Sequence, residues 1–147
     1  MQDRTVLKSM IHRHVLSVAP SATVQDAACA MTAANCGSIL VVESGTVLVG
    51  ILTERDLMTR ILAKGLDAGT TPVGAVMTHG PICVEPETKV INALVIMIER
   101  GFRHLPVVIA KDHQILGVFS VRDAMPREIQ SALNLTEFNE KVNDALG

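Results

Sequence analysis

Two short segments of the chain, GILTERD and GVFSVRD, place a hydroxyl three residues before an aspartate. The pairs are Thr53 with Asp56 and Ser120 with Asp123. A carboxylate can accept hydrogen bonds from both hydroxyls of a ribose, and a hydroxyl beside the free N–H groups of a helix start can contact a phosphate. In isolation the S/T-x-x-D pattern is more typical of a helix cap, and capping and binding can coexist.

Basic residues accompany the second of these segments. Arg103 and His104 begin the sequence RHLP, at the place where the first half of the chain has GSIL, beginning at Gly37 and Ser38. A guanidinium offers a fork of donors that suits phosphate, and His104 can add another donor. Taken alone, Arg103 is more typical of a solvated charge at a strand end, and His104 of a packed residue.

Arg55 and Arg122 directly precede the two aspartates. Each could reach a phosphate or pair with a carboxylate, and both interpretations stay open. Because only the second half adds Arg103 and His104, we expect the second site to bind the more tightly. The first site is poorer in charge, so we expect it to be empty or to take a less charged ligand.

The two segments belong to an internal repeat of the whole chain. Identical residues recur at an offset of 66, and one extra residue in the second hairpin shifts the offset to 67. Such ordered identities indicate a tandem duplication. The matched pairs are Val18/Val84, Pro20/Pro86, Val24/Val90, Ala27/Ala93, Met31/Met97, Val41/Val107, Val42/Val108, Gly50/Gly117, Arg55/Arg122 and Asp56/Asp123.

Each copy predicts the same order of elements. An extended segment and a proline turn lead to a helix, two strands and a final helix opened by Thr53 or Ser120; Gly65 is expected to end the first of these final helices. The predicted bounds are extended segments 15–18 and 82–85, helices 23–35 and 88–100, first strands 38–43 and 104–109, and second strands 47–52 and 115–119.

The same patterns predict the domain organisation. A stretch with one Gly, two Thr and a Pro separates the copies, and a tail after the second copy is expected to add a helix capped by Thr136. Phe138, Val142 and Leu146 would lie along one side of it. The predicted bounds are repeat 1 at 8–65, a linker at 66–72, repeat 2 at 73–126 and a C-terminal helical tail at 127–147.

Composition disfavours several classes of function. The net charge is −2, with no Trp, no Tyr and no run of basic residues, which disfavours nucleic-acid binding. No apolar run is long enough to span a bilayer, and the N-terminus has no apolar signal core. Cys29, Cys36 and Cys83 form no CxxC pair, so we expect a reducing, cytoplasmic setting. Cys29 and Cys36, seven residues apart on a helix of small residues, are expected to pack in the core.

The helices predicted at 23–35 and 88–100 are apolar on nearly every side. A helix without a polar face is usually buried on more than one side. In so small a chain, part of that surface should meet another subunit. The pattern therefore predicts a homodimer.

These motifs resemble the CBS-domain family over about residues 8 to 126. The resemblance is carried by GSILVV with GILTERDL, by RHLPVV with GVFSVRDA, and by VMTHGPICVEPETKVINAL. It implies an α/β (α+β) fold of two beta-alpha-beta-beta-alpha repeats packed about a pseudo-twofold, known as a Bateman module. Such modules are regulatory rather than enzymatic, often dimerise, and bind adenosine ligands in clefts between the repeats.

The resemblance implies AMP, ADP or ATP as ligand, with NAD(H) and S-adenosylmethionine as alternatives, no obligatory cofactor, and an energy-sensing role exerted on a separate partner protein. It places ribose at the aspartates and the base beside the lead-in strand of the opposite repeat. The favoured second cleft then comprises Arg103, His104, Leu105, Pro106, Ser120, Arg122, Asp123, Ile11, His12 and Leu16, and the first cleft Gly37, Ser38, Thr53, Arg55, Asp56, Met77, Thr78 and Ile82.

Two other interpretations remain open. The chain could be an adaptor with vestigial clefts that pairs with a partner independently of ligand. It could also be a metal- or redox-responsive protein that uses His12, His14 and His79 or its cysteines, but no spacing supports a metal site. No nucleophile–base set and no Walker or Rossmann glycine pattern is present, so we expect no catalytic residues.

Overall fold

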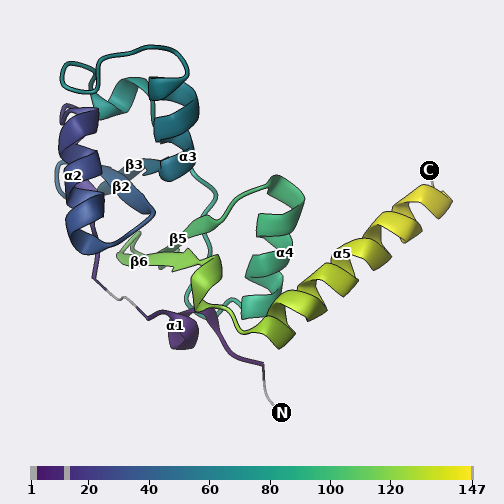
Figure 1. Cartoon of the computed structure of the whole chain (residues 1–147). Helices are drawn as coiled ribbons and strands as arrows, with labels where there is room; N and C mark the ends of the chain where they lie inside the picture. The colour runs from purple at the N-terminus through teal and green to yellow at the C-terminus, as the bar shows by residue number, and fades with distance from the viewer. Residues whose placement is uncertain (1–2, 12–13, 147) are drawn as a thin grey trace. The chain divides into compact units, whose positions relative to one another are not determined.

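The structure, a computed structural model, describes residues 3–11 and 14–146. It divides into two compact units that do not coincide with the two sequence repeats, and Figure 1 shows the elements of each. Unit 1 is formed by Met1–Arg13, Cys83–Asp112 and Leu116–Gly147, and unit 2 by His14–Ile82 and His113–Ile115.

Unit 2 is built on a four-stranded sheet. Its strands lie in the order β1 (Ser17–Val18), β2 (Ser38–Glu43), β3 (Val47–Thr53) and β4 (Thr78–His79). β1 runs parallel to β2, whereas β3 is antiparallel to both β2 and β4. The first five residues of β2 are buried, and four of them, Ile39 to Val42, form the apolar run expected in the centre of a domain.

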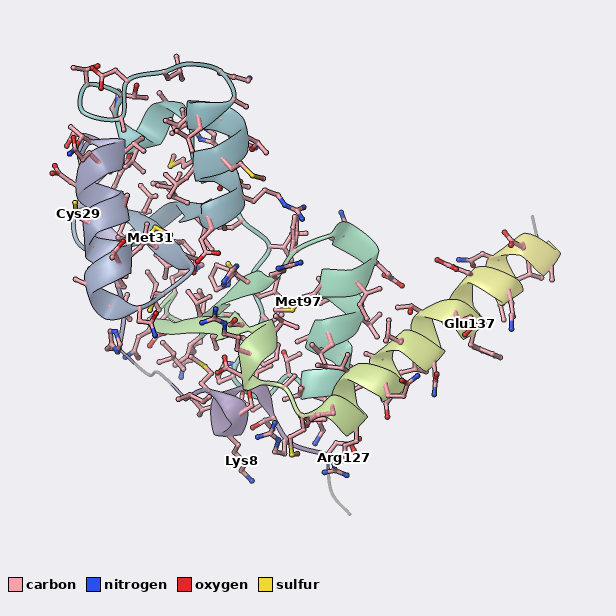
Figure 2. The ribbon with its side chains drawn as sticks, in the orientation of Figure 1. Lys8, Cys29, Met31, Met97, Arg127 and Glu137 are labelled. Atoms are coloured by element: carbon pink, nitrogen blue, oxygen red, sulfur yellow. The ribbon has the colours of Figure 1, made fainter. Side chains whose placement is uncertain are left out.

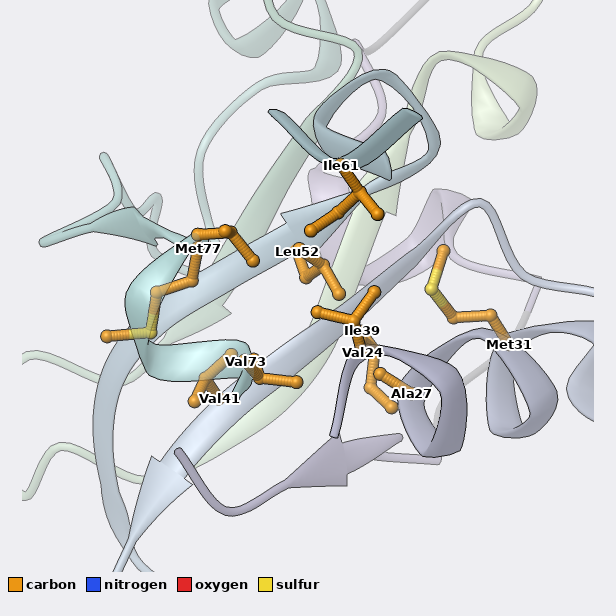
Figure 3. Close-up of a cluster of buried hydrophobic side chains, with 10 residues drawn as sticks. Val24, Ala27, Met31, Ile39, Val41, Leu52, Ile61, Val73 and Met77 are labelled. Atoms are coloured by element: carbon orange, nitrogen blue, oxygen red, sulfur yellow. The ribbon is translucent and has the colours of Figure 1, made fainter. Parts of the chain in front are cut away.

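The core of unit 2 lies between this sheet and its helices. It receives side chains from helix α2 (Val24–Ala34), the π-helical segment η1 (Leu57–Leu62) and the 3-10 turn η2 (Val73–Ala75), as Figure 3 shows. Gly50 of β3 is required here because a Cβ would collide with the Met77 sulfur and lie 2.9 Å from the Thr78 carbonyl oxygen. The core consists of Val24, Ala27, Met31, Ile39, Val41, Leu52, Ile61, Val73, Val76 and Met77.

Unit 1 combines a two-stranded sheet with three helices. The sheet pairs β5 (His104–Val108) with β6 (Ile115–Ser120), and Val84 adds an isolated parallel bridge to β5. The helices are α1 (Val6–Ser9), α4 (Val90–Arg100) and α5 (Pro126–Leu146). Met97 of α4 is as buried as its repeat partner Met31 of α2, each 3% exposed (Figure 2). The side chains of this unit with no exposed surface are Val6, Val90, Ala93, Leu105, Val107, Phe119 and Ala132.

Each repeat begins with a segment that we call its lead-in segment, residues 3–11 for repeat 1 and residues 71–82 for repeat 2. These two segments explain why the compact units do not coincide with the sequence repeats. In unit 1, the Val6 N–H donates to the Thr88 carbonyl at 2.7 Å, and the Val90 N–H donates to the Arg4 carbonyl at 3.0 Å. Unit 2 repeats this pattern at equivalent positions, with N–H bonds from Val73 to Ala22 at 2.8 Å and from Val24 to Thr71 at 2.9 Å. Each compact unit therefore contains the lead-in segment of the other repeat.

The first helix and both strands predicted for each copy are present with bounds within two residues of those predicted. The prediction that Gly65 ends the helix that follows Thr53 is also confirmed. Its φ is +67°, its N–H donates to the Leu62 carbonyl at 3.2 Å, and the Leu66 N–H donates to the Ile61 carbonyl at 3.0 Å. This is the hydrogen-bond pattern of a Schellman C-cap.

The helix predicted after Ser120 is only a 3-10 turn, η3 (Val121–Asp123), because Pro126 begins a new helix. The expectation that Thr136 caps the tail helix is wrong. α5 runs without interruption, and Thr136 lies in its interior, where its hydroxyl donates to the Leu133 carbonyl at 2.8 Å. A proline is well tolerated at the first helical position, and Glu128 accepts from the Met125 N–H at 2.8 Å.

Phe138, Val142 and Leu146 do share a side of α5, and all three are exposed. Among residues 3–11 and 14–146, no helix combines the length and the apolar character needed to cross a membrane.

Candidate functional site

The two repeated turns share the hydrogen bond from the backbone N–H of the hydroxyl residue to the aspartate, and they differ in which N–H the hydroxyl accepts from. In unit 2, the Asp56 Oδ2 accepts from the Thr53 N–H at 3.0 Å, and the Thr53 hydroxyl accepts from the Asp56 N–H at 3.2 Å. In unit 1, the Asp123 Oδ2 accepts from the Ser120 N–H at 2.9 Å, and the Ser120 hydroxyl accepts from the Arg122 N–H at 3.3 Å. Each aspartate therefore caps its turn through one carboxylate oxygen, Oδ2. The two turns differ in the partner of the other carboxylate oxygen, Oδ1.

The second oxygen of each carboxylate has a different partner. The Asp56 Oδ1 lies 3.6 Å from the Arg60 Nε, and Asp56 is 7% exposed. The Asp123 Oδ1 instead accepts from the Ile11 N–H at 3.3 Å, and Asp123 is half-buried. The Oδ1 atom of the first carboxylate therefore pairs with a cation, whereas Oδ1 of the second accepts from a neutral backbone donor, although the charge of Arg4 also acts on Asp123.

A backbone hydrogen bond joins each turn to the start of the preceding strand. The Glu54 N–H donates to the Gly37 carbonyl at 3.0 Å in unit 2, and the Val121 N–H donates to the Arg103 carbonyl at 3.1 Å in unit 1. Gly37 with its neighbour Ser38 is thus brought to Thr53, and Arg103 with its neighbour His104 is brought to Ser120. The buried Ser38 is also the strand partner of Thr53.

Unit 1 brings together most of the residues predicted for the second site. Arg103 and Arg122 are exposed, and His104 is half-buried. Leu105 and Pro106 are buried, and the Pro106 carbonyl accepts from the Val84 N–H at 2.9 Å. The charged members of the set therefore lie at the surface of the unit, and the apolar members support the strand from within.

The lead-in residues predicted for the second site have different positions. Ile11 is 69% exposed and contacts Asp123 through its N–H, so it belongs to the same turn. Leu16 belongs to unit 2, where it packs against the core and its carbonyl accepts from the Leu40 N–H at 3.0 Å. His12 lies outside the described residues.

All residues predicted for the first site lie in unit 2. Arg55 is exposed, Met77 is buried in the core, and Thr78 pairs with Ile51 across β3 and β4. Ile82, the last residue of its segment in unit 2, is half-buried.

Arg60 was not predicted as part of the first site. Its Nη1 donates to the carbonyl oxygens of Val76 at 3.0 Å and Met77 at 2.9 Å, while its Nε faces Asp56. It therefore joins the candidate turn to the lead-in segment in the same unit. The signal was available, because Arg60 follows Asp56 by four residues and such pairs are neighbours on a helix.

Arg4 and Glu128 support the turn of unit 1 and were not predicted either. Arg4 donates to both carboxylate oxygens of Glu128, at 2.6 and 3.1 Å, and also to the Asp123 carbonyl at 3.1 Å. The hydrogen bond from Arg4 lowers the pKa of Glu128; burial opposes this shift, and the Met125 N–H adds to it. The same hydrogen bond raises the pKa of Arg4.

Comparison with known proteins assigns both halves of the chain to the same domain family. The CBS domain family model matches residues 7–63 and again residues 73–127. A mitochondrial CBS domain-containing protein of Arabidopsis thaliana, CBSX3, is 40% identical over 107 residues, which are 70% of this chain and 51% of that protein. Another Arabidopsis protein, CBSCBSPB5, is matched over only 19% of its length. The chain thus spans about half or less of these relatives.

Solved structures share the same architecture. The hexameric CBS-CP12 protein from bloom-forming cyanobacteria is 27% identical with a TM-score of 0.75, over 84% of this chain and 67% of that one. The CBS domain protein PAE2072 from Pyrobaculum aerophilum, complexed with AMP, has a TM-score of 0.77 at 24% identity, over 90% of this chain and 99% of that one. The α/β fold predicted from the repeats is confirmed by this agreement.

Proposed function

The chain belongs to the CBS domain family as a tandem pair of CBS domains, and on this premise we propose that it is a regulatory module that binds an adenosine-containing nucleotide and signals to a separate protein. One observation carries the proposal. Both units hold an aspartate at the start of a short helical turn with one oxygen fixed by the backbone N–H of the preceding hydroxyl residue. A carboxylate held in this way is oriented in advance for two ribose hydroxyls.

The turn of unit 1 is the better candidate for a phosphorylated ligand. The Val121 N–H donates to the Arg103 carbonyl, and this backbone hydrogen bond holds the exposed Arg103 next to the turn. The exposed Arg122 is part of the turn itself. Guanidinium groups bind phosphate through two parallel N–H bonds, and this fork favours AMP, ADP or ATP over uncharged adenosine. Gly37 and Ser38 supply no such charge at the turn of unit 2.

The residues of the chain itself, rather than its relatives, support this ligand class. PAE2072 is complexed with AMP, but at 24% identity its likeness shows the shared fold. In this chain, an adenine base would rest on aliphatic side chains, because the sequence contains no Trp and no Tyr. NAD(H) and S-adenosylmethionine carry the same ribose and remain alternatives within the proposal.

The proposal assigns regulation rather than catalysis to the module. A ligand can regulate a partner only if it binds one conformation of the module more tightly than another. We therefore propose that nucleotide binding shifts the population of conformations that a separate protein recognises. The three free cysteines fit a reducing compartment such as the cytoplasm, although one relative is mitochondrial.

A direct test is isothermal titration calorimetry with AMP, ADP, ATP, adenosine, NADH and S-adenosylmethionine, with GMP as a control that keeps ribose and phosphate but changes the base. We expect an adenine nucleotide to bind more tightly than adenosine. At a ligand concentration about a hundred times the dissociation constant, unfolding should cost about 2.7 kcal/mol more. Absence of binding by every adenine ligand would contradict the proposal and favour a ligand-independent adaptor.

A further inference from the structure

The chemical asymmetry between the two turns lies in what faces the free oxygen of each carboxylate. In unit 2, Arg60 Nε is 3.6 Å from the Asp56 Oδ1. In unit 1, the position that matches Arg60 in the repeat is Arg127, which lies in the first turn of α5, where its charge acts on Glu128. Arg60 thus places a cation of the first turn beside the oxygen that ribose needs, whereas Arg4, whose charge acts on Asp123, donates to its backbone carbonyl oxygen.

Arg60 is held in this position by two further contacts. Its Nη1 donates to the carbonyl oxygens of Val76 and Met77, at 3.0 and 2.9 Å. Those carbonyls belong to a segment packed into the core of unit 2, since Val76 is 6% and Met77 5% exposed. An arginine anchored at one end loses little further entropy when its Nε pairs with a carboxylate, so this ion pair is more persistent than a free surface pair.

The contact at Asp123 is easier to exchange. Its Oδ1 accepts from the N–H of Ile11 at 3.3 Å, and Ile11 is 69% exposed, so water can satisfy this donor if a ligand hydroxyl takes its place. At Asp56 a ribose would have to displace a cation, and the Arg60 Nε would lose its carboxylate. Displacing a charged partner costs more than displacing a neutral one.

We propose that Arg60 is a specificity-determining residue whose ion pair with Asp56 withholds that carboxylate from ribose, so that the turn of unit 1 is occupied first. This inference rests on the proposed nucleotide function. Binding at the turn of unit 2 requires Arg60 to leave Asp56. Since the same side chain holds the Val76 and Met77 carbonyls, occupancy of that turn also disturbs the lead-in segment of unit 2.

The test isolates the turn of unit 2 by working in an Asp123→Asn background. AMP titrations compare this protein with the same protein carrying Arg60→Gln, which removes the charge but keeps an amide donor for the Val76 or Met77 carbonyl. We expect Arg60→Gln to tighten AMP binding about two- to fivefold, the range that follows from the strength of a half-exposed ion pair. Arg100→Gln, an exposed arginine at the end of α4, is the matched control and should leave AMP binding unchanged.

Arg60→Lys keeps the charge and should give a smaller gain than Arg60→Gln, because one ammonium replaces the separate Nε and Nη1 donors. A folded Arg60→Gln protein that binds AMP equally or more weakly overturns the proposal, because Arg60 would then be neutral or a ligand contact. If Arg60→Gln does not fold, Arg60→Met takes its place, and a folded Arg60→Met protein that binds AMP equally or more weakly overturns the proposal.

The outcomes separate this inference from the proposed function. Wild-type protein that binds AMP, loses affinity with Asp123→Asn and is insensitive to Arg60→Gln would leave the function standing and remove the role of Arg60. If the wild type and every variant fail to bind an adenine ligand, both proposals fall.

Discussion

Arg4 and Glu128, 124 positions apart in the chain, are joined by two hydrogen bonds of 2.6 and 3.1 Å. The Glu128 side chain is 5% and the Arg4 side chain 28% exposed. A third bond links Arg4 to the Asp123 carbonyl at 3.1 Å, and Glu128 also accepts from the Met125 N–H. One ion pair therefore connects the N-terminal segment, the candidate turn of unit 1 and the start of α5.

Glu128→Gln should destabilise the protein at neutral pH by about 1–3 kcal/mol, because it removes one partner of a largely buried ion pair. The lowered pKa of Glu128 sets the pH dependence. Its contribution is complete above the ordinary glutamate value of about 4.3 and is lost as the pH falls through the lower, folded-state pKa. Thermal or urea unfolding between pH 3 and pH 7 measures both effects.

The matched control for this variant is Glu137→Gln. Glu137 forms an ion pair with Lys141 at 3.3 Å, but both side chains are about two-thirds or more exposed, on the outer half of α5 (Figure 2). Such a pair contributes at most a few tenths of a kcal/mol. The stability difference between the wild type and Glu128→Gln should shrink at acid pH. A difference that stays constant from pH 7 to pH 3 would contradict the role given to the carboxylate.

Local features of the fold were predictable from the sequence because short-range chemistry determines them. The hydroxyl–aspartate spacing marks both turns, Gly65 marks a helix end, and β2 contains an unbroken apolar run from Ile39 to Val42. The failure at Thr136 has a local cause too. Pro126 suits the first position of a helix and is followed by Glu128 at a capping position, so the helix begins ten residues before Thr136.

Long-range relationships were not predictable in this way. No pattern pairs Arg4 with Glu128, and the packing of Val73 and Met77 into the core of unit 2 depends on contacts that sequence spacing does not encode. The candidate turns were found because each is contiguous. Their different partners, Arg60 and Ile11, could be recognised only from the fold.

Arg103→Ala should weaken AMP binding about tenfold, since hydrogen bonds to charged groups contribute about 1.5–3 kcal/mol. Adenosine lacks the phosphate, so its affinity should change little. Calorimetry with both ligands measures the difference, and Arg100→Ala on α4 serves as the control for loss of an exposed arginine. Equal losses for AMP and adenosine would refute the assignment of Arg103 to phosphate.

The apolar helices predict self-association, and we propose a homodimer formed through their exposed apolar side chains. Ile98 of α4 is 39% and the nearby Phe102 38% exposed. Ile98→Glu should therefore shift sedimentation at micromolar concentration from dimer toward monomer, because a charge would be buried in the interface. Leu62→Glu, at a 77% exposed position of η1, should leave the dimer intact. A wild-type protein that sediments only as monomer would contradict the proposal.

The central claim is that an adenosine ligand binds through the Asp123 carboxylate, and titration of AMP into Asp123→Asn and Asp56→Asn tests it most directly. Asparagine can still cap through its carbonyl oxygen, but its amide group cannot accept from the second ribose hydroxyl. We predict that AMP binds the wild type, that Asp123→Asn weakens it about tenfold or more, and that Asp56→Asn changes it less than about twofold. Equal affinities in all three proteins would contradict the claim.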